Sequence, residues 1–176
     1  MLNESVDLKT FLVTQLESST RGIMAAMQGL SLDQLAYAPA YGSNSIAWLA
    51  WHLSRYRDEI SALAAGVEQT WIEHAWYGKF NLLPENDGIG DSPDDVAAFS
   101  PDPELLLNYV EAVHADAVKR VQSLTEQQIN RVAAYVFPTE RPAWRALASM
   151  LGDSAQHAGQ INYLRGMISG FGWLSA

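Results

Sequence analysis

The sequence contains no cysteine among its 176 residues. Disulfide bonds, cysteine-ligated zinc and a cysteine nucleophile are therefore excluded, and any metal ion must be held by histidine, aspartate or glutamate. Positive charge is also scarce, because 11 Lys and Arg stand against 20 Asp and Glu, a formal net charge of -9 at pH 7. Binding to a phosphate backbone relies on clustered Lys and Arg, so we expect no nucleic-acid partner.

Long apolar runs are missing as well. No stretch reaches the roughly 18 apolar residues of a membrane-spanning helix, so we expect no membrane partner. The N-terminus lacks a basic segment followed by an apolar one, which is the pattern of a secretory signal, and a cytoplasmic protein is the simplest interpretation. With 48% hydrophobic and 18% charged residues and no break in composition, residues 1–176 are expected to fold as one globular domain.

Apolar residues recur at helical spacing in four long segments, whereas the alternating pattern of strands is almost absent. The predicted helices cover about residues 8–28, 45–65, 103–124 and 143–169. Asp102, Pro103 and Glu104 supply an N-cap, a proline at the first helical position and an acid in the first turn, which marks the start of the third helix. The sequence therefore predicts an all-α fold, a four-helix bundle.

Two short segments in the connections look alike. Leu30 to Leu35 and Leu124 to Ile129 each begin with a hydroxyl residue that can cap a short helix and carry an apolar residue four positions later. The longest connection, residues 67–102, contains too many aromatic residues for a solvated linker, and we predict a short helix near Trp71 to Tyr77 that packs on the bundle.

Three polar residues occupy faces of the predicted helices that are otherwise apolar. Asp153 and His157 stand one turn apart on the last helix, and His52 shares a face of the second helix with Trp48 and Tyr56. A carboxylate and two imidazoles that meet in a core must be paired, protonated or coordinated, because an unpaired buried charge is costly. A metal centre and a hydrogen-bonded Asp153–His157 pair with His52 as a satisfied core histidine both remain open.

Two segments resemble the signature regions of a known family. They are residues 44–53, NSIAWLAWHL, and residues 153–166, DSAQHAGQINYLRG. Together they are similar to the DinB/YfiT-like superfamily, and in particular to its actinobacterial branch, which includes mycothiol-dependent maleylpyruvate isomerase. The resemblance covers nearly the whole chain and implies a four-helix bundle with up-down-down-up connectivity.

The resemblance also implies a site and an activity. His52, Asp153 and His157 match the positions that bind a divalent metal ion in the family, with zinc as the first choice and nickel, manganese or iron as alternatives. Many members have His where this chain has Asp153, and the isomerase branch has Glu. Characterised members are implied to be S-transferases or isomerases that use mycothiol, bacillithiol or a related low-molecular-weight thiol, which would supply the sulfur that this chain lacks.

The alternative function is a noncatalytic, stress-related helical bundle in which the metal serves stability or dimerisation. Under the enzymatic hypothesis the partners are a small-molecule substrate or thiol. A homodimer is compatible with both the enzymatic and the noncatalytic hypothesis. An open coordination position beside a pocket would favour an enzyme, and a filled or inaccessible site would favour the alternative. We expect the open side to face a pocket lined by Trp48 and Tyr56 and partly roofed by residues 71–80.

Other polar residues have weaker functional interpretations. Tyr56 and Glu59 lie on the same side of their helix as His52 and could orient a substrate or act as a base, although tyrosine in an apolar stripe more often packs. Arg165 could receive a carboxylate of a thiol cofactor, or serve only as a partner of a helix end or the surface. The remaining candidates are expected to be solvated: His74, His114, Asp87, Asp91, Asp94 and Asp95.

Overall fold

A computed structural model describes residues 7–134, 139–170 and 172–175 of the protein. Four long helices dominate it: α1 (Leu8–Met27), α3 (Ile46–Ala65), α7 (Pro103–Ser123) and α9 (Ala143–Ser169). Their bounds agree with the predicted ranges to within one residue, and the all-α class is confirmed. Residues 1–6, on which the secretory-signal argument depends, lie outside the described ranges.

The helices start and stop where local chemistry dictates. The Ser45 hydroxyl accepts a hydrogen bond from the Trp48 backbone N–H at 3.2 Å and caps α3, and the Asp102 carboxylate caps α7 through the Leu105 N–H at 2.9 Å. Gly66 ends α3 with φ at 74°, a left-handed conformation that favours glycine. These caps set the register of α3, the helix that carries His52.

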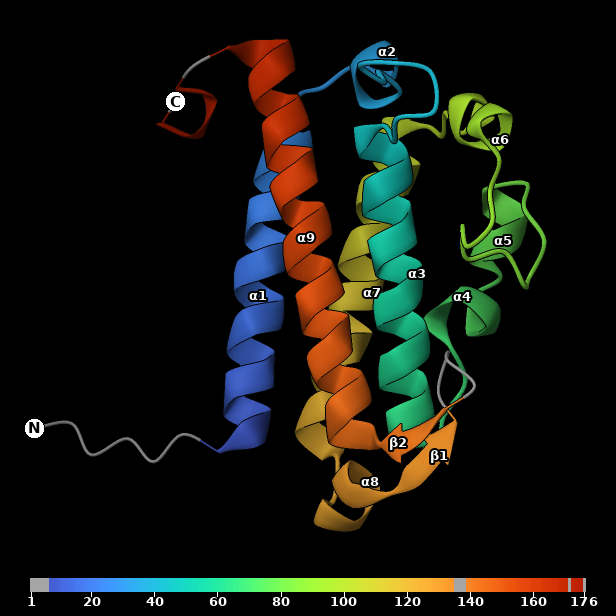
Figure 1. The fold of residues 1–176 in the computed structure, drawn as a ribbon, viewed down its shortest axis with the longest axis vertical. Helices are drawn as coiled ribbons and strands as arrows, with labels where there is room; N and C mark the ends of the chain where they lie inside the picture. The colour runs from blue at the N-terminus through green and yellow to red at the C-terminus, as the bar shows by residue number, and fades with distance from the viewer. Residues whose placement is uncertain (1–6, 135–138, 171, 176) are drawn as a thin grey trace, which may run out of the picture.

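The four helices form a bundle in which the chain runs up α1, down α3, down α7 and up α9 (Figure 1). α3 packs against α7 and α9, and α1 packs against the same two helices, so α1 and α3 lie on a diagonal. The seam between α3 and α9 therefore joins the second and the last long helices. This is the seam at which the two candidate signature segments meet.

Short elements complete the fold: α2 (Leu32–Leu35), α4 (Thr70–Glu73), α5 (Trp76–Lys79), α6 (Pro93–Ala98), α8 (Glu126–Asn130), η1 (Trp173–Ser175), β1 (Val132–Ala134) and β2 (Glu140–Pro142). α2 and α8 both begin with a full capping box, which confirms the predicted likeness of these segments. β1 and β2 pair in antiparallel fashion, Val132 opposite Pro142. The sequence did not reveal this hairpin, because three residues are too few for alternation to be read. Within the described ranges, no helix combines the length and apolar character of a membrane span.

The aromatic residues of the long connection belong to the core. The predicted helix near residues 71–77 is present as two short helices, α4 and α5. Trp71 is fully buried, with its ring centroid 5.3 Å from that of Tyr109 and 6.1 Å from that of Trp51. Phe80 packs on Tyr109 at 5.4 Å. The connection is therefore held on the α3/α7 side of the bundle by burial of aromatic surface.

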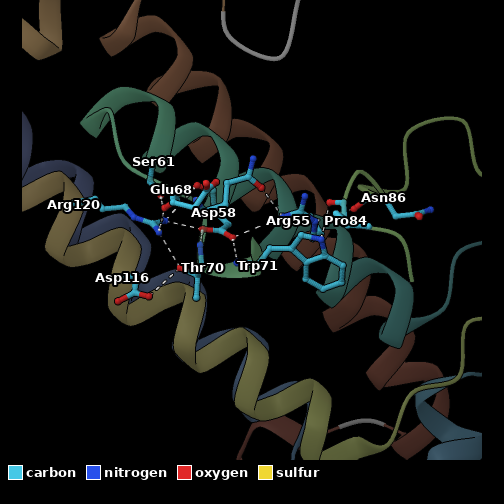
Figure 2. Close-up of polar contacts among 11 residues, drawn as sticks. Arg55, Asp58, Ser61, Glu68, Thr70, Trp71, Pro84, Asn86, Asp116 and Arg120 are labelled. Carbon is cyan, nitrogen blue, oxygen red and sulfur yellow. Dashed lines mark hydrogen bonds and ion pairs between the residues drawn. The ribbon is translucent and has the colours of Figure 1, made fainter. Parts of the chain in front are cut away.

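A buried carboxylate reinforces this attachment (Figure 2). Asp58 of α3 is fully buried and accepts hydrogen bonds from the Thr70 N–H at 2.9 Å, the Trp71 N–H at 2.8 Å and the Arg120 guanidinium at 2.6 Å. Arg120 also donates to the Glu68 carbonyl at 2.9 Å. We call Asp58, Arg55, Arg120, Thr70 and Trp71 the Asp58 cluster; it ties α3, α7 and α4 together.

Arg55 extends the cluster along the connection. Its Nε donates to the Asn86 carbonyl at 2.9 Å, and its guanidinium lies over the Trp71 ring at 4.6 Å. The Trp71 indole N–H donates in turn to the Pro84 carbonyl at 2.9 Å. Residues 84–86 are thus fixed beside α3, immediately before the residues that contact His52 (Figure 2).

Candidate metal centre

His52 of α3 converges with Asp153 and His157 of α9. Each offers one ligand atom, and these atoms lie within 4.8 Å of one another. Asp153 Oδ1 is 3.4 Å from His157 Nε2, and the two imidazole centroids are 5.3 Å apart with ring planes at 80°. For ligand bonds of 2.0–2.1 Å, a tetrahedral site has ligand atoms about 3.3 Å apart, so the spacing within α9 already suits a metal ion.

Both imidazoles have one ring nitrogen engaged. His52 Nδ1 lies 2.5 Å from the Asp87 carbonyl oxygen, and since a carbonyl can only accept, Nδ1 carries the proton. His157 Nδ1 donates in the same way to the Gln160 side-chain oxygen at 2.7 Å. In the neutral imidazoles each Nε2 then has a lone pair, whereas in protonated His157 the Nε2–H points to Asp153 Oδ1 at 3.4 Å. Metal-ligating histidines typically donate their other ring N–H to an oxygen acceptor in this manner.

Asp153 is incompletely satisfied. Its Oδ2 is buried and has no hydrogen-bond partner in the described part of the chain, although Oδ1 faces His157. A carboxylate oxygen left in this state is costly unless a cation or a donor completes it. The donor set and this orphaned oxygen fit a divalent cation.

The position of these residues differs in detail from the prediction that Asp153 and His157 lie in the core stripe. Their side chains are 28% and 16% exposed, because the seam between α3 and α9 is open on one side. Ser154, which is fully buried, takes the inward position on α9 instead.

The loop that begins at Asn86, where the segment held by Arg55 and Trp71 ends, supports His52 from outside the bundle. Besides the Asp87 carbonyl, Trp48 stacks on the His52 ring at 4.6 Å with planes at 15°, and the Trp48 indole N–H donates to Asp91 at 2.8 Å. The loop thus sets the tautomer of His52 by one contact and its ring orientation by another. We call residues 86–91 the supporting loop.

Gly88 allows the supporting loop to approach this closely. Its φ is 89°, and a Cβ built there would lie 2.8 Å from Trp48, 2.9 Å from His52 Nδ1 and 3.0 Å from Trp51. Any side chain would be strained and would displace the very rings that form the site. Gly90 has nearly the same φ of 87°, but nothing lies within 4 Å of its Cβ position.

The electrostatics of the site depend on Asp153. The pKa of His157 is raised, chiefly because its ring hydrogen-bonds to Asp153, with burial opposing that shift. The pKa of Tyr56 is raised by burial and by the negative charge of Asp153, so Tyr56 is a hydroxyl donor at neutral pH. Burial also raises the pKa of Glu59.

An open cavity of about 410 Å³ adjoins two of the three residues, His52 and Asp153. Its lining is His52, Tyr56, Ile89, Ser149, Gly152, Asp153 and Gln156. Ile89 of the supporting loop flanks it, whereas the predicted roof of residues 71–80 does not take part. The prediction was wrong because those aromatic residues gain more by burial against Trp51 and Tyr109 in the core.

The structure separates the weaker candidates. Tyr56 lines the cavity and Glu59 does not. Arg165 donates to the Gln28 carbonyl at 3.2 Å and lies 5.7 Å from the centroid of the Trp173 ring, so it joins the ends of α9 and α1, away from the cavity. His74 is exposed as predicted.

Three of the residues predicted to be solvated are not. His114 is half-buried, with its Nδ1 3.1 Å from the Thr20 hydroxyl oxygen. Asp87 and Asp91 are half-buried in the supporting loop, held there by the contacts with His52 and Trp48. Asp94 and Asp95 are exposed, and Asp95 forms the capping box of α6 with Ser92.

Sequence reasoning missed the outer contacts of the site. The Asp87 carbonyl leaves no trace in sequence because it is a backbone atom, and Gly88 could have been noticed only as one of two glycines flanked by aspartates. Gln160, three residues after His157, could have been found from helical spacing. The run Arg55-Tyr56-Arg57-Asp58 inside an apolar helix was a further signal, because so many buried charges require partners.

Comparisons with known proteins agree with this architecture. The family model described as the DinB superfamily matches residues 15–161, a range that includes His52, Asp153 and His157. Among solved structures, a conserved protein from Enterococcus faecalis is similar, with a TM-score of 0.83 and 21% identity over 94% of this chain and 99% of that one. At this identity the likeness shows the fold alone. None of the curated proteins matches significantly.

Proposed function

This chain belongs to the DinB superfamily, and on that premise we propose that it is a metal-dependent enzyme whose centre is His52, Asp153 and His157. The proposed reaction is S-transfer or isomerisation through a low-molecular-weight thiol of the mycothiol or bacillithiol type. The thiol class follows from the resemblance of residues 44–53 and 153–166 to the actinobacterial branch.

One observation carries the metal part of the proposal. Two imidazoles whose Nδ1 atoms are already bonded meet a carboxylate with an orphaned oxygen at the edge of a cavity. A hydrogen-bonded Asp153–His157 pair accounts for Oδ1 only and leaves Oδ2 without a partner, whereas a divalent ion would satisfy it. The ligand set of two His and one carboxylate suits zinc first, and nickel, manganese or iron are also compatible.

A divalent ion held there would lower the pKa of a bound thiol and make its nucleophilic thiolate available at neutral pH. The protein residues supply position and shape. Asp87 and Gln160 accept hydrogen bonds from Nδ1 of His52 and His157, so in the neutral imidazoles Nε2 is the nitrogen left to bind a metal ion. The cavity is within the size range of small-ligand pockets, roughly 300–1,000 Å³.

The cavity lining can orient a substrate. Tyr56 keeps its hydroxyl proton, because its pKa is raised, and can donate to a carbonyl or carboxylate oxygen. Gln156 and Ser149 add an amide and a hydroxyl, and Ile89 adds an apolar wall. Tyr56 is therefore the residue that we propose for substrate positioning.

The test begins with protein purified without a nickel-binding tag. We expect about one divalent ion per chain by elemental analysis. After exchange for cobalt, low-molecular-weight thiols are added one at a time while the near-ultraviolet spectrum is recorded. A sulfur-to-metal charge-transfer band is expected if the thiolate occupies the open position.

The His74→Ala variant is the matched control, because His74 is exposed and distant in sequence from both signature segments. It should bind metal and thiol like the unchanged chain. Full cobalt occupancy with no band for any thiol would contradict S-transfer and leave the noncatalytic role as the better account.

A further inference from the structure

A further open cavity lies between α3, α6 and the connection that leads from α5 to the supporting loop. Its volume is about 430 Å³. Trp51 of α3 lines it together with Phe80, which follows α5, and Phe99, which follows α6. The supporting loop separates it from the candidate metal centre, because Asp91 lines this cavity and Ile89 lines the other. We call it the Trp51 cavity.

Aromatic rings form one wall of the Trp51 cavity. The ring centroids of Trp51 and Phe99 are 5.0 Å apart, and those of Phe99 and Phe80 are 6.2 Å apart with ring planes at 7°. The face of an aromatic ring carries negative potential and attracts a cation. Because these rings already hold one another in place, a ligand would not have to order them.

Two carboxylates from different elements line the same cavity, Asp91 of the supporting loop and Asp95 of α6. Each has an oxygen engaged within the protein. Asp91 Oδ2 accepts from the Trp48 indole N–H at 2.8 Å, and Asp95 Oδ2 accepts from the Ser92 backbone N–H at 2.9 Å. In the described ranges no Lys, Arg or His nitrogen lies within 4.0 Å of either carboxylate. The fold therefore leaves the negative charge of this cavity without a cation.

Trp51 gives an independent indication of a ligand. Its side chain is 1% exposed, and its indole N–H has no hydrogen-bond partner in the described part of the chain. Buried donors are nearly always paired, because an unpaired donor loses its bond to water and gains nothing in return. Since Trp51 lines the cavity, an acceptor oxygen of a bound molecule would complete it.

An organic cation suits this cavity better than a metal ion does. Among the described residues, the group whose ligand atoms are close enough to share one ion is His52, Asp153 and His157, and neither Asp91 nor Asp95 belongs to such a group. A metal ion also gains nothing from a wall of aromatic carbon, since it requires oxygen or nitrogen ligands. An organic ammonium ion can use both the rings and the carboxylates.

We propose that the Trp51 cavity binds a small organic ammonium ion that also carries an acceptor oxygen. The charge lies near Asp91 and Asp95, the carbon groups pack on the aromatic wall, and the oxygen accepts a hydrogen bond from the Trp51 N–H. The site does not depend on the proposed metal centre. It lies close to it, however, because Asp91 also holds Trp48, which stacks on the His52 ring at 4.6 Å.

Three probes of nearly equal size test the parts of this ligand. They are choline, the alcohol with a tert-butyl group in place of the trimethylammonium group, and ethyltrimethylammonium, which lacks the oxygen. Binding is measured by isothermal titration calorimetry in chelator, so that the metal centre plays no part. We expect choline to bind roughly ten-fold more tightly than the uncharged alcohol and about three-fold more tightly than ethyltrimethylammonium.

Asp91→Asn and Asp95→Asn remove the charge but keep an acceptor oxygen for Trp48 and Ser92. Each should weaken choline binding by roughly three-fold or more and leave binding of the uncharged alcohol unchanged. Asp94→Asn is the matched control, because Asp94 lies on the same short helix as Asp95 and does not line the cavity. It should bind choline like the unchanged chain. Equal weakening by Asp94→Asn and Asp95→Asn would indicate a diffuse surface charge and overturn the site.

Trp51→Phe removes the N–H and keeps a ring, so it should weaken binding of choline but not of ethyltrimethylammonium. If this buried substitution prevents folding, the two Asp variants decide alone. A chain that does not prefer choline to the uncharged alcohol would overturn the inference, and so would unchanged choline affinity in both Asp variants. Neither result affects the proposed function, which the metal analysis and the thiol titration decide.

Discussion

Asp58 of α3 and Asp153 of α9 are two carboxylates with opposite surroundings. Asp58 is fully buried and receives two backbone N–H groups and the Arg120 guanidinium, with Arg55 at 3.7 Å (Figure 2). Asp153 is 28% exposed and faces His157, and its second oxygen has no partner in the described ranges.

The difference shows how a structural charge can be told from a ligand. At Asp58 every lone pair that the fold leaves accessible is used, so the network has nothing to offer a further group. At Asp153 the protein leaves an oxygen free and aims two prepared imidazoles at the same place. The first arrangement rigidifies the connection, and the second is ready for a cation.

The largest expected effect tests the structural side of the comparison. Asp58→Ala leaves Arg120 and two backbone N–H groups buried without their acceptor, and should lower the free energy of unfolding by about 3–5 kcal/mol. Urea denaturation followed by circular dichroism measures it. Asp116→Ala is the control, because Asp116 is only partly buried and contacts a single threonine hydroxyl and Lys119. A loss below about 1 kcal/mol for Asp58→Ala would mean that the cluster is not structural.

The converse pattern, a large effect on metal binding and a small one on stability, is expected at the candidate metal centre. His52→Ala and His157→Ala should each abolish stoichiometric metal binding, because two protein ligands hold a divalent ion far less tightly than three. In chelator, where no metal contributes, both variants should unfold within about 1 kcal/mol of the unchanged chain, as expected for partly exposed side chains. Elemental analysis and urea denaturation together decide, and unchanged metal content in both variants would refute the site.

The supporting loop connects the segment held by the Asp58 cluster to His52. Its two glycines allow the effect of close packing to be separated from the effect of backbone strain. Gly88→Ala should weaken metal binding by about 10- to 100-fold, as for other outer-contact changes, because its Cβ would meet Trp48 and His52. Gly90→Ala has the same backbone strain at φ 87° but open space around it, so it reports strain alone. Zinc competition measures both variants. Equal affinities would show that the loop does not set the geometry of His52.

The four long helices could be predicted from the sequence because apolar periodicity and caps such as Asp102-Pro103 are local signals. The convergence of His52 with Asp153 and His157 could also be predicted, since all three interrupt faces that are otherwise apolar. The partial exposure of Asp153 and His157 could not be predicted, because the rotation of α9 about its axis depends on how it packs against α3. Ser154 rather than Asp153 took the inward place.

The outer support of the site escaped prediction for a different reason. It is made from a backbone carbonyl, a glycine and the far end of a long connection whose path depends on where Trp71 and Asp58 anchor it. The expected roof of residues 71–80 failed on the same point, because an aromatic cluster can cover a site or enter the core, and only packing decides. The contacts of buried Arg57 with α1 were missed because its hydroxyl partners, Thr20 and Ser19, are 37 and 38 residues away in sequence.

The smallest expected effect is a pH dependence of stability in a polar layer outside both regions, formed by Arg57 of α3, Thr20 of α1 and His114 of α7. Thr20 accepts a hydrogen bond from Arg57 and lies 3.1 Å from His114 Nδ1, to which its hydroxyl can donate when the imidazole is neutral. Burial lowers the pKa of His114, and Arg57 and Arg21 lower it further, whereas Glu17 and Glu111 oppose the shift.

Because the folded-state pKa of His114 lies below its unfolded value of about 6.5, the unfolded chain binds more protons in this range. The stability contributed by neutral His114 is therefore fully present above pH about 6.5 and is lost as the pH falls through the folded-state pKa. Urea unfolding in chelator between pH 5 and 8, for the unchanged chain and His114→Gln, isolates this group by difference. The unchanged chain should lose more stability on acidification than the variant does. A parallel pair of curves would mean that His114 titrates as it does in the unfolded chain, and that the charge of Arg57 is not felt across the layer.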